Sequence, residues 1–82
     1  MNTVYILKCC DDTLYTGSTV DMKKRLRAHN ELKNGAKYTR ARRPVVLVHQ
    51  EECETLAEAR AREAEIKRMT REEKLLFIQT QK

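Results

Sequence analysis

Two tyrosines near the start of the chain stand beside a cluster of positive charge. Tyr5 lies in the stretch Val4–Ile6, and Tyr15 opens the stretch Tyr15–Gly17, ten residues further on. A basic segment with helical spacing, residues 21–32, follows directly. Two phenols beside several cations suit a site that binds a phosphodiester. Such a site also needs a phosphate clamp and a metal ligand, which the rest of the chain must supply.

Arg25 and His29 are the polar residues that a helix over residues 21–32 places on or near its inward side. A charge there costs stability unless it is paired or opens onto a cleft. Arg25 is therefore either a snorkelling side chain or a functional cation, and His29 is either a satisfied core histidine or a site residue. The inward apolar stripe consists of Met22, Leu26 and Leu32.

Glu63 is the one carboxylate set into the apolar face of the helix predicted over residues 55–68. A buried carboxylate needs a cation. Glu63 either pairs with Arg25, which is a structural role, or holds a divalent metal at the lip of a cleft. The helical spacing leaves both alternatives open. The apolar face consists of Leu56, Ala59 and Ile66.

The elements that position these side chains follow the order β-β-α-(loop)-β-α-α. Strand segments are rich in β-branched, aromatic and apolar residues, and two acidic residues mark the first turn. Each predicted helix begins with an N-cap residue, twice in a capping box with Glu three positions on. The predicted segments are strands over 3–9 and 13–19, a turn at Asp11-Asp12, a helix from Asp21 to about Leu32 ended by Asn34-Gly35, a basic loop or short helix over 36–43, a strand over 45–48, a helix from Thr55 with Glu58, and a last helix from Thr70 with Glu73.

This order predicts an α+β fold, in which helices flank a three-stranded, mainly antiparallel sheet. We expect residues 1–82 to form a single domain. The apolar run Val45–Val48 is interpreted as the central strand. The placement of the phenols depends on the hairpin turn. A two-residue loop puts Tyr5 and Tyr15 on opposite faces of the sheet, whereas an odd-length loop or a bulge puts them on the same face.

The charge of the chain is unevenly distributed. The net charge is +5, and residues 22–43 hold nine Lys or Arg against the single acid Glu31, whereas residues 51–73 hold eight Glu against five Lys or Arg. The middle third therefore indicates a surface for a polyanion, nucleic acid first. The three cysteines, Cys9, Cys10 and Cys53, show no metal-binding spacing and are expected to be free thiols. With no membrane span and no secretory signal in the sequence, we expect a cytoplasmic protein.

In these residues and their order, the chain resembles the GIY-YIG nuclease superfamily, and within it the small single-domain bacterial proteins of the UPF0213 type. Val4–Ile6 is similar to the first signature with Val for Gly, and Tyr15–Gly17 to the second with Thr for Ile. The other matching stretches are Thr19-Val20-Asp21 with Arg25-Leu26 and His29-Asn30, then Lys37-Tyr38-Thr39-Arg40 and Arg42-Arg43-Pro44, and finally Ala59, Glu63, Ile66 and Lys67.

The resemblance implies a catalytic set of Tyr5, Tyr15, Arg25, His29 and Glu63. It assigns Glu63 as the sole protein ligand of one Mg²⁺ or Mn²⁺, bound weakly without substrate. Tyr15 is implied as general base, with a phenol pKa that must fall from about 10, and Tyr5 as a group that orients water or phosphate. Arg25 is implied to stabilise charge on phosphorus, with His29 as a helper. The implied nucleic-acid-binding residues are Lys33, Lys37, Tyr38, Arg40, Arg42 and Arg43.

Three functions are compatible with these features. The first is a metal-dependent endonuclease or phosphodiesterase that hydrolyses DNA or RNA, DNA in the first place, with a protein partner supplying specificity. The second is a non-catalytic nucleic-acid-binding module on the same scaffold, with salt-sensitive binding through the basic segment. The third is a protein-interaction domain whose basic surface meets an acidic partner.

Overall fold

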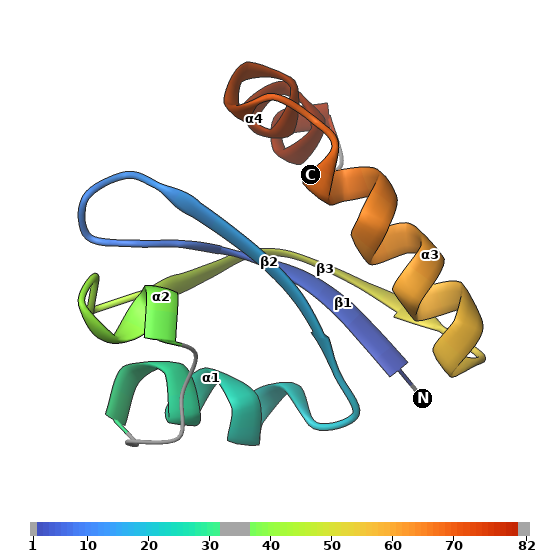
Figure 1. The fold of residues 1–82 in the computed structure, drawn as a ribbon, viewed down its shortest axis with the longest axis horizontal. Helices are drawn as coiled ribbons and strands as arrows, with labels where there is room; N and C mark the ends of the chain where they lie inside the picture. The colour runs from blue at the N-terminus through green and yellow to red at the C-terminus, as the bar shows by residue number, and fades with distance from the viewer. Residues whose placement is uncertain (1, 32–36, 81–82) are drawn as a thin grey trace.

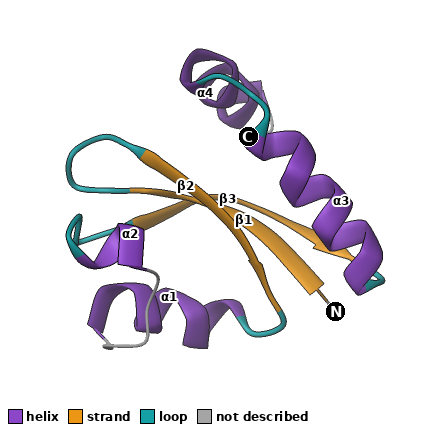
Figure 2. Ribbon diagram, viewed as in Figure 1, coloured by secondary structure: helices purple, strands orange, loops and turns teal. Residues whose placement is uncertain are grey.

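Three antiparallel strands form one sheet, and helices cover both of its faces (Figures 1 and 2). The structure is a computed structural model that describes residues 2–31 and 37–80. Helices α1 and α2 lie on one side of the sheet, and α3 and α4 lie on the other (Figure 1). The predicted fold class is confirmed. The elements are β1 (Asn2–Lys8), β2 (Leu14–Thr19), α1 (Met22–Glu31), α2 (Lys37–Arg40), β3 (Val46–Cys53), α3 (Leu56–Lys67) and α4 (Arg71–Thr80).

The central strand of the sheet is β1, because the strand order is β2-β1-β3. The four residues Val4–Leu7 are each 0% exposed, which requires cover on both faces of the strand. The prediction that Val45–Val48 forms the central strand is wrong. Strand β3 lies at the edge and extends to Cys53, and its residues Val46 and Gln50 are exposed. A short apolar run was compatible with either position, and the polar second half of β3 fits an edge strand.

The alternation of side chains along β1 separates two apolar layers. Tyr5 and Leu7 face α1, where Met22 and Leu26 pack against them. Val4 and Ile6 face α3 and α4, in a cluster completed by Ala59, Ile66 and Ile78. The burial predicted for Leu56 is wrong, since this first residue of α3 is 50% exposed. The residues of α3 that are buried in this cluster are Ala59 and Ile66.

A three-residue turn sets the register of the hairpin. The Cys9 N–H donates to the Thr13 carbonyl (2.8 Å), and the Asp12 N–H donates to the Cys9 carbonyl (3.0 Å). Asp12 adopts φ 67°, a left-handed conformation that Asp tolerates better than most residues. This odd-length turn places Tyr5 opposite Gly17 and Leu7 opposite Tyr15. Both phenols therefore lie on the α1 face of the sheet, which is the alternative that a catalytic pair requires.

The three predicted N-caps are confirmed, and of the two predicted capping boxes the one at Thr70 has both bonds, whereas the one at Thr55 has the bond to the Thr side chain alone. Asp21 Oδ1 accepts from the backbone N–H of Lys24 (3.1 Å), three residues on. Thr55 accepts in the same way at the start of α3 (3.1 Å). Thr70 and Glu73 form the full reciprocal capping box, with bonds of 2.9 and 3.1 Å. These local bonds define where each helix begins and so fix the direction of its functional side chains.

Two further sequence-based expectations concern the thiols and membranes. The three cysteines are free, with Cys9 buried and Cys10 exposed. Within residues 2–31 and 37–80, the structure contains no helix long and apolar enough to cross a membrane.

Candidate active site

Four of the five predicted catalytic residues meet on the α1 face of the sheet. The ring centroids of Tyr5 and Tyr15 are 6.4 Å apart, and those of Tyr15 and His29 are 5.1 Å apart. Arg25 donates from Nε to the Tyr5 hydroxyl oxygen (3.4 Å) and also hydrogen-bonds Tyr15. These bonds raise the pKa of Arg25, so its guanidinium is charged. One cation is therefore held between two phenols.

His29 is the buried link between the sheet and α2. Its side chain is 0% exposed, with one ring nitrogen 2.9 Å from the Tyr5 hydroxyl and the other 2.7 Å from Thr39 Oγ1. Burial, together with the charges of Arg25 and Arg43, lowers the pKa of His29 to about 4. The imidazole is therefore neutral near pH 7. Sequence reasoning missed Thr39, because a hydroxyl between basic residues carries no pattern that distinguishes it from a surface residue.

The two phenols differ in accessibility. Tyr5 is fully enclosed, and this burial raises the pKa of Tyr5, although the hydrogen bond from Arg25 opposes the rise. Tyr15 is only partly buried. Tyr15 is therefore the phenol that a bound phosphodiester or water can reach, whereas Tyr5 contacts Arg25 and His29 from inside the protein.

Gly17 supplies the space that the Tyr5 ring occupies. A Cβ atom added at Gly17 would lie 2.6 Å from the Tyr5 hydroxyl oxygen and 3.2 Å from a ring carbon of Tyr15. Its backbone φ is not positive, so no turn demands glycine here. The glycine of the second tripeptide is needed because the tyrosine of the first lies against it.

Glu63 lies on α3, and its side chain is 21% exposed. Its Oε2 accepts from the Lys67 ammonium at 2.7 Å, and Ser18 also donates to it. Partial burial opposes ionisation, but these two hydrogen bonds outweigh it and hold the pKa of Glu63 below its usual range. The alternative of an Arg25–Glu63 ion pair is wrong, because Arg25 bonds the phenols and Glu63 bonds its own helical neighbour four residues on.

Glu63 nevertheless influences the phenol of Tyr5 electrostatically. Its negative charge contributes to the raised pKa of Tyr5, and the phenol of Tyr15 contributes to the raised pKa of Lys67. Helix α3 packs against β1 and β2, and Ser18 directly follows Gly17 on β2. The carboxylate therefore lies on the α3 side of the sheet, where it bonds Ser18 of β2.

The ionised carboxylate of Glu63 is a ligand that suits a single hard cation. Within the described part of the chain, no group of three or more His, Cys, Asp or Glu could hold a metal ion. One ionised carboxylate is a suitable ligand for Mg²⁺ or Mn²⁺, which take remaining ligands from water and substrate phosphate. Lys67 lies at the carboxylate, so a metal there would compete with its ammonium group.

The predicted nucleic-acid-binding arginines have mixed environments. Arg42 pairs with Asp11 (3.1 Å), at the tip of the hairpin. Arg43 donates to the backbone carbonyls of His29 and Ala28, near the end of α1. Arg40 is exposed. Charge alone therefore overstates how many cations face outward. The other predicted positions are Lys33 and the side chains of Lys37 and Tyr38, and these lie outside the part of the chain that the structure describes.

A comparison with protein families places the chain in a known class. Residues 1–75 match the GIY-YIG catalytic domain, and the chain belongs to the GIY-YIG family. Its curated relatives include a UPF0213 protein of Syntrophus aciditrophicus, which is 58% identical over 77 residues (94% of this chain and 88% of the relative). A UPF0213 protein of Clostridium perfringens is 55% identical over 78 residues (95% and 83%).

Two solved structures share this fold. The solution structure of the UPF0213 protein BH0048 from Bacillus halodurans has 40% sequence identity and a TM-score of 0.63, covering 98% of this chain and 85% of that one. The solution structure of the protein EF2693 from E. faecalis has 41% identity and a TM-score of 0.66, covering 96% and 83%. The predicted membership of the GIY-YIG superfamily and its UPF0213 branch is confirmed.

Proposed function

We propose that this protein is a metal-dependent nuclease that hydrolyses phosphodiester bonds in nucleic acid, DNA in the first place. The observation that carries the proposal is the Arg25 guanidinium, which bonds the phenols of Tyr5 and Tyr15. Membership of the GIY-YIG family supports it. A cation that bonds phenol oxygens rather than a carboxylate keeps its charge available for a phosphate.

The roles of the side chains follow from their accessibility. Tyr15 in its phenolate form accepts a proton from the attacking water, since it is the partly exposed phenol and Arg25 bonds it. Arg25 stabilises the extra negative charge that develops on the phosphoryl oxygens. Glu63 holds one Mg²⁺ or Mn²⁺, and the bound ion would supply charge neutralisation at the leaving oxygen. Tyr5 holds Arg25 in place from the interior, and His29 bonds Tyr5 from behind.

Cleavage assays with Mg²⁺ or Mn²⁺ test this function on labelled single-stranded, duplex and branched DNA, and on RNA. We expect Glu63→Gln and Arg25→Ala to lower the cleavage rate by roughly 10²–10³-fold, the size of effect of removing one group that stabilises charge in a transition state. Glu65→Gln is the matched control, because this carboxylate is on the same helix and more than half exposed. Cleavage that is absent for every substrate, or equal in the Glu63→Gln variant, would contradict the proposal.

A non-catalytic nucleic-acid-binding module is the second candidate, and the Glu63–Lys67 ion pair favours it. This pair already satisfies the carboxylate without a metal (2.7 Å). The module would bind DNA with an affinity that falls steeply with salt and that survives Glu63→Gln. Fluorescence anisotropy with the same DNA substrates separates the two candidates.

We further propose a cytoplasmic location, supported by the three free thiols, and a protein partner that supplies specificity.

A further inference from the structure

We propose that Thr39 is a positioning residue that sets the tautomer of His29 and, through it, the direction of the Tyr5 hydroxyl proton. The functional part of this inference rests on the proposed nuclease activity. The hydrogen-bonding part stands independently, because it follows from donors and acceptors that are buried together. Thr39, His29 and Tyr5 are each 0% exposed.

The hydroxyl of Tyr5 has two hydrogen-bonding neighbours among the described residues. One is Arg25 Nε at 3.4 Å, and the other is His29 Nε2 at 2.9 Å. A guanidinium can only donate, so the Tyr5 oxygen accepts from Arg25. A buried hydroxyl proton requires an acceptor, and His29 Nε2 is the one within reach. The Tyr5 proton therefore points at His29, and Nε2 carries no hydrogen.

This assignment fixes the other nitrogen of His29. A neutral imidazole carries one N–H, so the hydrogen must be on Nδ1. Nδ1 lies 2.7 Å from Thr39 Oγ1, which accepts it. The hydrogen bonds thus run in one direction, from the site to Thr39. Arg25 donates to the Tyr5 oxygen, Tyr5 donates to His29 Nε2, and His29 Nδ1–H donates to Thr39 Oγ1.

Helix α2 is held in place for this role. The backbone N–H of Arg42 donates to the Thr39 carbonyl (2.9 Å), which closes the turn after the helix. Arg43 then bonds the carbonyls of Ala28 and His29 on α1. The Thr39 hydroxyl is consequently fixed relative to the imidazole. Loss of this acceptor would favour the Nε2–H tautomer, which donates to Tyr5 and competes with Arg25 for the phenol oxygen.

Long-range ¹H–¹⁵N NMR of the imidazole nitrogens tests the tautomer directly in the wild-type protein. We expect His29 to be protonated on Nδ1. His49 is an internal reference for the opposite tautomer, because its Nε2 lies 2.7 Å from Glu51 Oε2, a carboxylate that can only accept. A wild-type His29 protonated on Nε2 would overturn the inference.

Two variants of Thr39 then test the cause. Thr39→Val removes the hydroxyl while keeping the branched shape, and Thr39→Ser keeps the hydroxyl. Leaving the buried Nδ1–H without an acceptor should shift the ratio of the Nδ1–H to the Nε2–H form at least about tenfold toward Nε2–H. The Thr39→Ser variant should retain the wild-type form, and the His49 signals should be unchanged in both. An unaltered His29 tautomer in Thr39→Val would also overturn the inference.

Kinetics separate this inference from the proposed function. With an active enzyme, Thr39→Val should lower kcat about tenfold with little change in KM, and Thr39→Ser should restore it. An equal loss in both variants would contradict the positioning role. A wild-type protein with no cleavage activity would refute the proposed function alone, since the tautomer of His29 would still be measured.

Discussion

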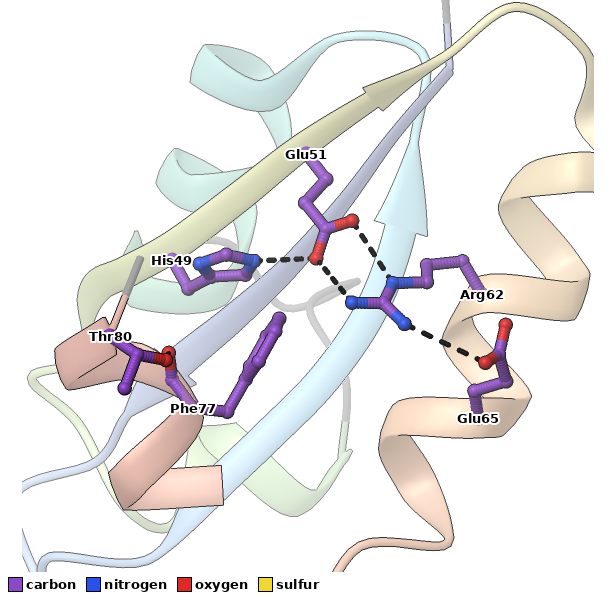
Figure 3. Close-up of polar contacts among 6 residues, drawn as sticks. All are labelled: His49, Glu51, Arg62, Glu65, Phe77 and Thr80. Atoms are coloured by element: carbon purple, nitrogen blue, oxygen red, sulfur yellow. Dashed lines mark hydrogen bonds and ion pairs between the residues drawn. The ribbon is translucent and has the colours of Figure 1, made fainter. Parts of the chain in front are cut away.

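Each face of the sheet carries a largely buried histidine among aromatic side chains, but the two settings differ in charge. On the α1 face, His29 lies between Tyr5 and Thr39, which are neutral groups. On the α3 and α4 face, His49 bonds the Glu51 carboxylate at 2.7 Å. Figure 3 shows the second cluster, in which Arg62 bonds the same carboxylate through two nitrogens (3.0 and 3.2 Å).

The difference shows which arginine is available for a ligand. Arg62 is compensated by Glu51, and its guanidinium lies 5.1 Å from the centre of the Phe77 ring. This cluster ties β3 to α3 and α4, so we interpret it as a structural brace. Arg25, by contrast, makes no ion pair with any carboxylate in the described part of the chain. A partly buried cation with neutral partners is costly for stability alone, which indicates a functional face.

Acid titration of stability should give the largest difference between the two faces. The pKa of His29 falls to about 4 in the folded protein, so between its unfolded value of 6.5 and 4 the unfolded chain binds more protons. Stability is then full above pH 6.5 and declines as the pH falls to 4, by about 3 kcal/mol from His29. The groups that oppose its protonation are Arg25 and Arg43.

Urea unfolding at several pH values measures this loss. A His29→Asn variant should lose the slope between pH 6.5 and 4.5, whereas a His49→Asn control should retain it. Carboxylates such as Glu51, whose pKa lies below its usual range, contribute at lower pH, where their stabilising charge is lost. A wild-type protein whose stability is constant down to pH 4.5 would remove this contrast between the faces.

Removing the Glu51 charge from the brace should lower the free energy of unfolding moderately. It should leave the hydrogen bonds of Tyr5 and Tyr15 on the other face of the sheet unchanged. Glu51→Gln removes the charge that Arg62 and His49 bond, and the side chain is 29% exposed, so we expect a loss of about 1–2 kcal/mol. Glu65→Gln is the matched control, because its contact with Arg62 is longer (3.6 Å) and more exposed. Thermal unfolding gives both values. A loss in Glu65→Gln as large as in Glu51→Gln would contradict the role of the brace.

The smallest expected effect is a gain in stability from a substitution on the same face of the sheet as the brace. Thr16 is opposite Ile6 and buried, and its hydroxyl is the one described buried side-chain polar atom without a hydrogen-bond partner. Thr16→Val keeps the shape and removes the unsatisfied group, so we expect a stabilisation of about 1 kcal/mol. The melting temperature should rise by about 4–8 °C. A decrease would mean that the hydroxyl has a partner, such as a buried water.

The local parts of the fold were predictable because their causes are local. Asp21, Thr55 and Thr70 begin helices through bonds to residues three positions on, and this spacing is visible in the sequence. The strand order was not, because the apolar run at Val45–Val48 fits a central or an edge strand. Its place depends on the burial of β1, which is a property of the whole sheet.

The residues of the candidate site were predictable from the sequence, but the hydrogen bonds and ion pairs between them were not. Helical spacing placed Arg25 and His29 on the inward side of α1, where the structure has them. Arg25 and a divalent metal were the predicted partners of Glu63, whereas the bonded cation is Lys67, its helical neighbour four residues on. Thr39 was missed because its contact with His29 depends on how α2 folds back onto α1.

The position of Gly17 has a consequence for mutational tolerance. Because even a methyl group would collide with the Tyr5 ring, any side chain there would displace the phenol and disturb its bonds to Arg25 and His29 together. The residues tolerated at Gly17 in the second tripeptide therefore depend on Tyr5 in the first. In a saturation library, Gly17 should be as intolerant as the residues that carry the chemistry, although it has no side chain of its own.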